Sequence, residues 1–257
     1  MLKVHNMEIH ISKDPQVLGK TAAEEGGYLI RQALASEEEV SVVLATGTSQ
    51  LEMLRHLVQQ DVDWSRVHIF HLDEYIGLGA EHPASFRKYI RKRFVEKVPS
   101  LKSVTYIHGD AENLEQELYR INEAISQKPV EVAFIGIGEN AHIAFNDPPA
   151  DFTVNKPYIR VKLDEKCRRQ QLGEGWFHSF EDVPEYAVSM SVKQIMRAKH
   201  LICSVSEKRK ASAVQRSVEG IISNEYPASI LQKHPDCRLF LDEGSASLLQ
   251  SGASPPK

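Results

Sequence analysis

Short apolar or β-branched runs alternate with longer amphipathic stretches along almost the whole chain of 257 residues. The runs are typical of strands and lie at 7–11, 41–46, 67–72, 130–137, 186–191, 200–205 and 237–242. Helical patterns separate them at 15–35, 49–60, 83–97, 111–127 and 208–219. This alternation is typical of a mostly parallel sheet with helices on both faces, so we expect an α/β, Rossmann-like fold.

The length of the chain fits one α/β domain, because folds of this class commonly reach this size around a single core. The sequence contains no internal repeat and no long linker, so we expect one domain over residues 1–257. The segment 164–184, DEKCRRQQLGEGWFHSFEDVP, mixes charges, glycines and aromatic residues between two predicted strands. Its irregular pattern favours a lid or an insertion.

The formal net charge of −4 gives the chain no global attraction for nucleic acid or for an anionic membrane. Any anion site therefore has to be built locally. No stretch approaches the roughly 18 apolar residues of a membrane span, and the N-terminal residues lack the apolar core of a signal peptide, so we expect a cytoplasmic protein. Cys167, Cys203 and Cys237 lack the spacing of a metal site or a disulfide framework, which indicates free thiols.

The segment ATGTSQ (45–50) follows a predicted strand and begins a predicted helix. Its small residues allow close approach of a ligand to the backbone, and free N–H groups at a helix start attract anions. A tight turn capped by Thr48 or Ser49 explains the same pattern equally well. The motif matches neither of the common nucleotide-binding patterns, so no nucleotide cofactor is indicated.

A second helix start, in SEKRKASAVQ (206–215), is strongly basic. Lys208, Arg209 and Lys210 oppose the dipole of the helix that they precede, so a bound anion explains them better than helix stability does. A solvated basic turn is the alternative.

The segment HLDEYIGL (71–78) places two acids at the end of another predicted strand. Asp73 or Glu74 could remove a proton next to a carbonyl group, provided that burial raises its pKa. The alternative is a loop acid that pairs with a helix. The segment HPASFRKYI (82–90) follows closely, and its Ser85 or Arg87 could face the same site.

The segment VAFIGIGENAHIAFNDPPADF (132–152) contains a buried strand, two glycines at a turn, and then His142 and Asp147. A loop that keeps these two residues close could form an acid/base pair in which the carboxylate orients the imidazole ring. A lone histidine is more often structural, but here two other loop motifs occupy equivalent positions after strands. That arrangement favours a functional site.

Together these segments resemble the glucosamine-6-phosphate deaminase family, within the larger group that includes the 6-phosphogluconolactonases. The resemblance covers about residues 8–249, and its motifs occur in order: TGTSQ, LDEYIGL, HPASF, GIGENAHIAFNDP, a lysine before an AVQ…VEG helix, and HPDCRLFLDE. The HIAFNDP segment is similar to the deaminases and not to the lactonases. The resemblance implies a sugar-phosphate substrate, no metal and no organic cofactor; homo-oligomers are compatible with it, because family members differ in assembly.

The resemblance also implies a role for each matching residue. Asp73 corresponds to the base that moves a proton between C2 and C1 of the open-chain sugar. His142 corresponds to the histidine that helps to open the sugar ring, and Asp147 stands where the family usually has a glutamate that partners it. The phosphate loop corresponds to Thr46, Gly47, Thr48 and Ser49, and the phosphate-binding lysine corresponds to Lys210.

Three departures from the family pattern lie in or near these motifs. Asn140 replaces an acid two residues before the histidine, and an amide cannot exchange a proton as a carboxyl group does. Asp147 is one methylene shorter than the usual glutamate, so it reaches His142 only if the loop backbone compensates. The family's second phosphate-binding arginine falls near Gly173, which leaves Arg168 or Arg169 as substitutes.

The function that the resemblance implies is deamination and isomerisation of glucosamine 6-phosphate, or a close hexosamine 6-phosphate, to a ketose 6-phosphate and ammonia. Asn140 keeps a second hypothesis open, an isomerase or a 6-phosphogluconolactonase-like hydrolase without deamination. A third hypothesis is a sensor that binds the sugar phosphate without turnover, although the retained Asp73 argues against it.

Overall fold

The computed structural model describes residues 2–4 and 6–250. Within these residues, eight strands form a central sheet in the order β1-β2-β11-β10-β7-β3-β4-β6. Their bounds in that order are Leu2–Val4, Met7–Ser12, Cys237–Asp242, His200–Val205, Val130–Ile135, Val40–Leu44, Val67–His71 and Ser103–Thr105. Every neighbouring pair from β2 to β6 is parallel, and only β1 is antiparallel to its neighbour. The expected α/β fold with a mostly parallel sheet is therefore confirmed.

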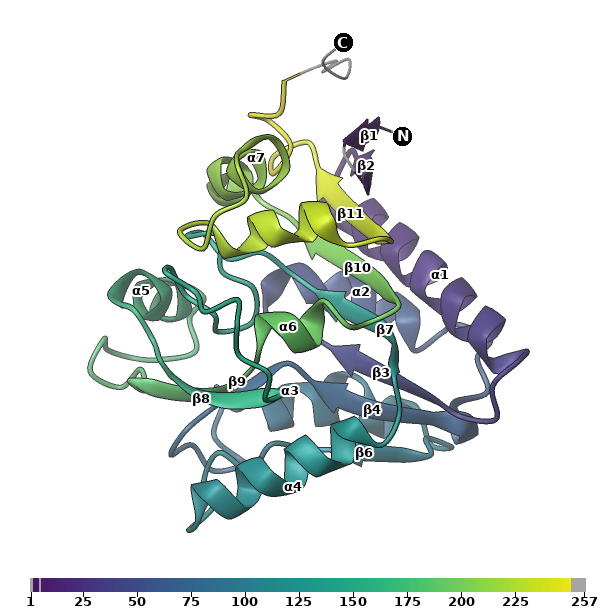
Figure 1. The fold of residues 1–257 in the computed structure, drawn as a ribbon, viewed down its shortest axis with the longest axis vertical. Coiled ribbons are helices and arrows are strands. Elements are labelled where there is room, and N and C mark those ends of the chain that lie inside the picture. The colour runs from purple at the N-terminus through teal and green to yellow at the C-terminus, as the bar shows by residue number, and fades with distance from the viewer. Residues whose placement is uncertain (1, 5, 251–257) are drawn as a thin grey trace.

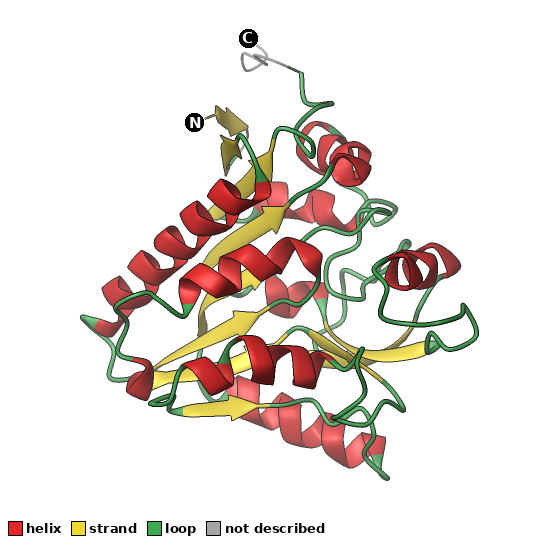
Figure 2. Ribbon diagram, turned by 180° about the vertical axis from the view of Figure 1, so that it is seen from behind, coloured by secondary structure: helices red, strands yellow, loops and turns green. Residues whose placement is uncertain are grey.

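Helices cover both faces of this sheet (Figures 1 and 2). One face packs against α1 (Pro15–Leu34), α2 (Leu51–Leu57) and α3 (Phe86–Arg93), and the other against α4 (Leu114–Ser126), α6 (Val192–Ile195) and α7 (Ala211–Glu219). The central strand β3 shows why the sequence needs both layers. Its Val42 points into the core beside α1 while the adjacent Val43 points into the core on the face that α4, α6 and α7 cover, because successive side chains of a strand alternate between faces.

A second, three-stranded antiparallel sheet contains β5 (Asp73–Tyr75), β9 (Tyr186–Met190) and β8 (Tyr158–Lys162) in that order. The strand expected at 186–191 is therefore real but lies outside the main sheet. Its apolar pattern identifies a buried strand without identifying the partner. Because β5 directly follows β4, the chain passes from one sheet to the other at Leu72.

The segment expected to be an irregular lid or insertion contains the helix α5 (Glu165–Gly173). Asp164 caps this helix by accepting a hydrogen bond from the Cys167 backbone N–H at 2.5 Å. Phe177, farther along the segment, packs with Tyr75 and Phe145 in a buried cluster. The segment is thus anchored to the second sheet. Within the described part of the chain, no helix is both long enough and apolar enough to cross a membrane.

Candidate active site

A pocket lies at the carboxyl ends of β3, β4, β7 and β10, where loops and helix starts converge as in other open α/β sheets. Residues from four of the motif segments identified in the sequence (45–50, 71–78, 82–90 and 132–152), together with the basic helix start, contribute to its lining. Of the residues expected in the site, the pocket is lined by Thr46, Gly47, Thr48, Ser49, Asp73, His142 and Lys210. Asn140 and Asp147 lie behind His142 instead.

The loop after β3 lines the pocket with all of its residues 45–50. Gly47 has a φ of 98°, a left-handed conformation that glycine adopts without a steric penalty. Tyr89 donates a hydrogen bond from its hydroxyl to the Gly47 carbonyl at 2.8 Å. The buried Gln50 amide donates to the carbonyls of Ile135 and Ser204, each at 3.2 Å. Gln50 thus fixes the loop to the ends of β7 and β10, a role that its place in the motif did not indicate.

Lys210 enters the pocket from the short 3-10 turn Lys208–Lys210 that precedes α7. Its ammonium group donates to the Ile137 carbonyl at 3.0 Å. Burial lowers the pKa of Lys210, and the neighbouring Glu174 acts in the opposite direction. The pocket therefore contains a fixed cation next to the backbone of the loop after β3, an arrangement that suits an anionic group.

Asp73 is the first residue of β5 and is buried at the pocket wall. Burial, and to a smaller extent the adjacent Glu74, raises the pKa of the Asp73 carboxyl well above its usual range. A carboxyl group with a raised pKa is a stronger base once ionised and can also return the proton, so it suits transfer of a proton between carbon atoms.

Glu74 does not share this position, although the sequence left the choice between the two acids open. Its carboxylate accepts hydrogen bonds from the Ser85 hydroxyl at 2.8 Å and from the backbone N–H groups of Phe86 and Arg87 at 3.1 and 2.8 Å. It therefore secures the start of α3. Arg87 in turn pairs with Asp110 at 2.8 Å, so Ser85 and Arg87 support the fold at this point and do not line the pocket.

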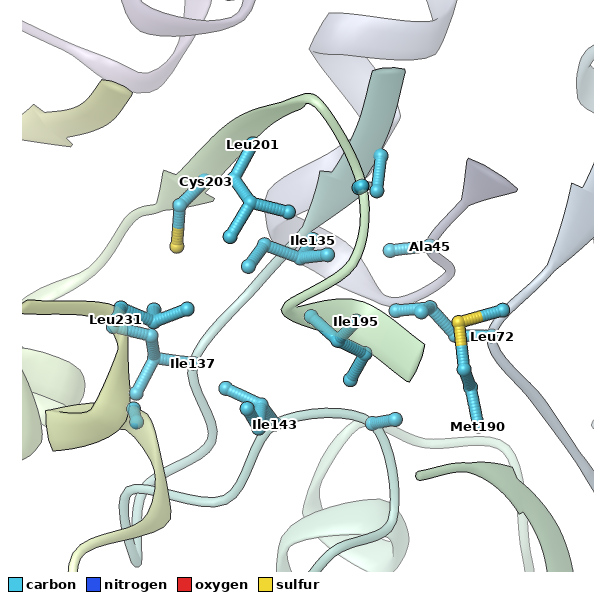
Figure 3. Close-up of a cluster of buried hydrophobic side chains, with 14 of the residues drawn as sticks. Ala45, Leu72, Ile135, Ile137, Ile143, Met190, Ile195, Leu201, Cys203 and Leu231 are labelled. Carbon is cyan, nitrogen blue, oxygen red and sulfur yellow. The ribbon is translucent and has the colours of Figure 1, made fainter. Parts of the chain in front are cut away.

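His142 lies on the loop that follows β7. Its imidazole ring packs on Gly138, where an added Cβ atom would lie only 2.2 Å from the ring. The adjacent Ile143 is fully buried in the core cluster that also contains Ile137 and Ile195, as Figure 3 shows. The apolar neighbour thus anchors the loop while the glycine leaves room for the imidazole.

Asp147 reaches His142 despite its short side chain. Its Oδ1 lies 3.1 Å from Nδ1 of His142, and the two side chains are only 6% and 9% exposed. Burial alone would raise the pKa of Asp147, but the interaction with His142 keeps it below the ordinary value. The loop between the two bends through Ala144, a non-glycine residue in the left-handed region with a φ of 49°, which is consistent with the backbone adjustment that a short acid requires.

Asn140 connects two carboxylates and does not face the pocket. Its amide nitrogen donates to Asp147 at 3.1 Å and to Asp164 at 3.2 Å, while its carbonyl oxygen accepts from the His142 backbone N–H at 3.2 Å. The backbone N–H of Asp164 also donates to Asp147 at 3.0 Å. The asparagine therefore acts as a brace for the His142–Asp147 pair.

Neither arginine considered as a second phosphate ligand lines the pocket among the described residues. Arg168 donates to the backbone carbonyls of Phe180 and Val183, which fixes the chain after α5. Arg169 is exposed and pairs with Glu165 one turn earlier on the helix. These positions do not support the expectation that Arg168 or Arg169 replaces the family's arginine. The two successive residues point in different directions from the helix, and neither direction leads into the pocket.

The helix α5 instead brings Gln170, Gln171 and Glu174 to the pocket, three residues that the sequence analysis did not single out. Gln171 accepts a hydrogen bond from the hydroxyl of Tyr75 at 2.7 Å, which fixes the orientation of its amide. Helical spacing places Gln170 and Glu174, four residues apart, on one side of the helix, but the charges and glycines of the segment leave no clear helical pattern in the sequence.

One cluster among the described residues brings potential metal ligands within 4.8 Å of one another: His142, Asp147 and Cys167. Burial first, and then the neighbouring acids, raise the pKa of the Cys167 thiol well above its usual range. The cluster consists of the His142–Asp147 pair and a buried thiol beside it. Cys203 and Cys237 are buried and free as well, as expected.

A parallel α/β sheet with a buried carboxyl, a histidine–carboxylate pair and a lysine around one pocket is the arrangement of an enzyme that performs acid–base chemistry on a small molecule. The family model of glucosamine-6-phosphate isomerases/6-phosphogluconolactonase matches residues 13–239. The chain belongs to this family.

Relatives of known name support this assignment over nearly the full length. The glucosamine-6-phosphate deaminase of Lacticaseibacillus paracasei is 34% identical, with 95% of this chain and 99% of that protein covered. The Bacillus cereus enzyme of the same name is 34% identical, with 94% and 89% covered. A solved monomeric glucosamine-6-phosphate deaminase superposes with a TM-score of 0.85 at 29% identity, covering 94% of this chain and all of that one. The fold is shared with the 6-phosphogluconolactonase of Thermotoga maritima, which superposes with a TM-score of 0.76 at 15% identity. That comparison covers 92% of this chain and 99% of the other.

Proposed function

We propose that this chain is an enzyme that converts glucosamine 6-phosphate, or a close hexosamine 6-phosphate, to a ketose 6-phosphate and ammonia. The observation that supports the proposal most strongly is Asp73, a buried carboxyl with a raised pKa in the same pocket as His142 and the loop after β3. The names of the relatives agree with it.

The proposed reaction begins with ring opening, in which His142 moves a proton between the ring oxygen and the C1 hydroxyl while Asp147 orients the imidazole. Asp73 then removes the proton from C2 of the open-chain aldehyde while the carbonyl oxygen takes up a proton from the substrate's ammonium group, which leaves an enolamine. Return of that proton to C1 gives a ketimine at C2. Water adds to C2 and ammonia leaves, which produces the ketose phosphate.

The phosphate of the substrate is proposed to lie against Thr46, Gly47, Thr48 and Ser49, with Lys210 as its cation. A phosphate fixed at this end places the rest of an open-chain hexose along the pocket toward Asp73 and His142. Fixing both ends of the substrate aligns C1 and C2 with the base, which lowers the entropic part of the barrier.

Asn140 keeps a second candidate open, an aldose–ketose isomerase or lactonase without ammonia release, because an amide stands beside the His142–Asp147 pair where the family has an acid, and an amide cannot exchange a proton with that pair. Ammonia release from glucosamine 6-phosphate and from galactosamine 6-phosphate, with Asp73→Asn as control, distinguishes the two. Ammonia that disappears in the variant supports deamination. Because C2 of both amino sugars carries the nitrogen, neither sugar can form a ketose without releasing ammonia. Ketose formation from glucose 6-phosphate, or hydrolysis of 6-phosphogluconolactone, without ammonia release from the amino sugars supports the second candidate, and no turnover of any of these substrates contradicts both.

We also propose that the enzyme acts in the cytoplasm as one domain, without a metal or organic cofactor. Assembly into a homo-oligomer stays a prediction, and the relative of known structure with the TM-score of 0.85 is described as monomeric. Sedimentation of the purified chain tests this point directly.

A further inference from the structure

The anion end of the pocket contains a carboxylate. Glu174 lines the pocket together with Thr48 and Lys210, and its side chain is only 4% exposed. A Cβ atom added at Gly47 would lie 4.0 Å from Oε2 of Glu174, so the carboxylate directly neighbours the loop after β3. A negative charge beside this loop repels a phosphate bound against the loop, so the Glu174 carboxylate and the proposed phosphate compete for this end of the pocket.

A second cation lies on the other side of Glu174. The Nη2 atom of Arg209 is 3.9 Å from Oε1 of Glu174 and 3.4 Å from the Thr48 hydroxyl. Glu207 and Glu139 hold the rest of the guanidinium, at 2.8 Å from Nε and 2.5 Å from Nη1. The edge that contains Nη2 is thereby directed toward the loop, although Glu207 Oε1 also accepts from it at 3.3 Å.

Glu174 separates this arginine from the pocket. Thr48 and Glu174 line both the pocket and the neighbouring cleft, whereas Arg209 lines only the cleft. Removal of the Glu174 side chain from its place would therefore join the two spaces and expose Nη2 of Arg209 to a ligand in the pocket.

The local chain allows Glu174 to move. It lies between Gly173 and Gly175, and a Cβ atom added at either glycine would meet no atom within 4 Å. Gly175 has a φ of 82°, in the left-handed region that glycine adopts readily. The Glu174 carboxylate accepts a hydrogen bond from the Gln170 amide at 3.1 Å, a contact that a phosphate at the same place could replace.

We propose that Arg209 is the second phosphate-binding cation of this chain and that Glu174 holds the place of the phosphate until a substrate displaces it. The phosphate then accepts hydrogen bonds from Arg209, Lys210 and the backbone of the loop after β3. The guanidinium suits this role because it offers parallel donors to two phosphate oxygens. The identity of the substrate rests on the proposed function, but the binding of phosphate does not require turnover.

Calorimetric titration of the full chain with inorganic phosphate tests the proposal. Arg209→Gln is expected to weaken phosphate binding about tenfold or more, and Arg209→Lys is expected to weaken it less because it retains the charge. Glu174→Gln is expected to strengthen binding about tenfold, because the competing charge is lost while the shape is kept. Arg169→Gln removes the same charge from an exposed position nearby and is expected to leave the affinity unchanged.

The proposal is overturned if Arg209→Gln leaves the phosphate affinity unchanged, if Glu174→Gln weakens it, or if the parent protein does not bind phosphate. A larger effect of Arg169→Gln than of Arg209→Gln overturns it too. Ammonia assays on the same proteins test the proposed deaminase function separately from phosphate binding. Phosphate binding that follows the expected order without ammonia release would contradict the proposed function and leave the assignment of Arg209 and Glu174 supported.

Discussion

Replacement of Asp73 by asparagine is expected to reduce kcat strongly and, at neutral pH, to stabilise the folded protein. The Asp73 carboxyl is buried, and its pKa is raised well above the ordinary value by that burial. An acid whose pKa is higher in the folded state favours folding below its unfolded pKa, and that contribution is lost as the pH rises through the folded pKa. Asparagine has the same shape and no charge, so its advantage should be absent in acid and should grow with pH.

The magnitude follows from linkage. The relevant pH range lies between the pKa of Asp73 in the unfolded chain and its higher pKa in the folded protein. Within that range, each unit of rising pH lowers the free energy of unfolding of the parent by about 1.4 kcal/mol relative to the variant. For a domain of this length that corresponds to a difference in Tm that widens by about 3 to 6 °C per pH unit. Loss of the proton-transfer base should meanwhile reduce kcat by about a hundredfold or more.

Calorimetric unfolding of both proteins from pH 4 to pH 8, together with ammonia release, checks both effects. Glu74→Gln is the matched control, because Glu74 is also buried but its carboxylate accepts hydrogen bonds from Ser85, Phe86 and Arg87. An amide there replaces an acceptor by a donor, so this variant should lose about 2 kcal/mol or more of stability. A Tm difference between parent and Asp73→Asn that does not change with pH, or a less stable variant at pH 8, would refute the reasoning.

Three further substitutions test the rest of the site. Lys210→Gln should raise KM about tenfold to a hundredfold with little change in kcat, because the lysine is proposed to hold a group that does not react, and steady-state kinetics measures this. Gly138→Ala places a methyl group 2.2 Å from the His142 ring, so kcat should fall about a hundredfold while circular dichroism shows an intact fold. Asn140→Asp places a carboxylate where the amide nitrogen now lies 3.1 Å from Asp147. The Tm of this variant relative to the parent should fall between pH 5 and pH 8 because the carboxylates repel one another. A variant with a higher Tm than the parent at pH 8 would contradict the bracing role of Asn140.

Hydrophobic periodicity predicts most of the main sheet, because six of the seven predicted strands lie in it close to their expected positions. The same signal placed residues 186–191 in that sheet, whereas β9 pairs with β5 and β8 in the second one. Burial of a strand is encoded in its own residues, but its partner is decided by distant segments. Three-residue strands such as β6 (Ser103–Thr105) were missed because they are too short to show a period.

The sequence predicts those residues of the site that directly follow a strand of the main sheet. Asp73, His142 and the loop after β3 meet in one pocket because the carboxyl ends of parallel strands converge. Glu174 and Gln171 were not predicted, because they reach the pocket from a helix that crosses it and belong to no strand end. The position of a residue after a strand can be inferred from the sheet topology, whereas the position of Glu174 and Gln171 depends on how the helix packs against the sheet.

The two departures from the family pattern in the loop after β7 are explained together. A carboxylate at position 140 would lie near both Asp147 and Asp164 and would repel them, whereas the Asn140 amide donates a hydrogen bond to each. Those bonds, with the backbone N–H of Asp164, orient the Asp147 carboxylate, whose Oδ1 lies 3.1 Å from His142. The short side chain of Asp147 and the amide of Asn140 therefore act together. Substitutions at these two positions should be measured singly and in combination. Asp164 caps α5, so the same network links the histidine to the helix that positions Glu174.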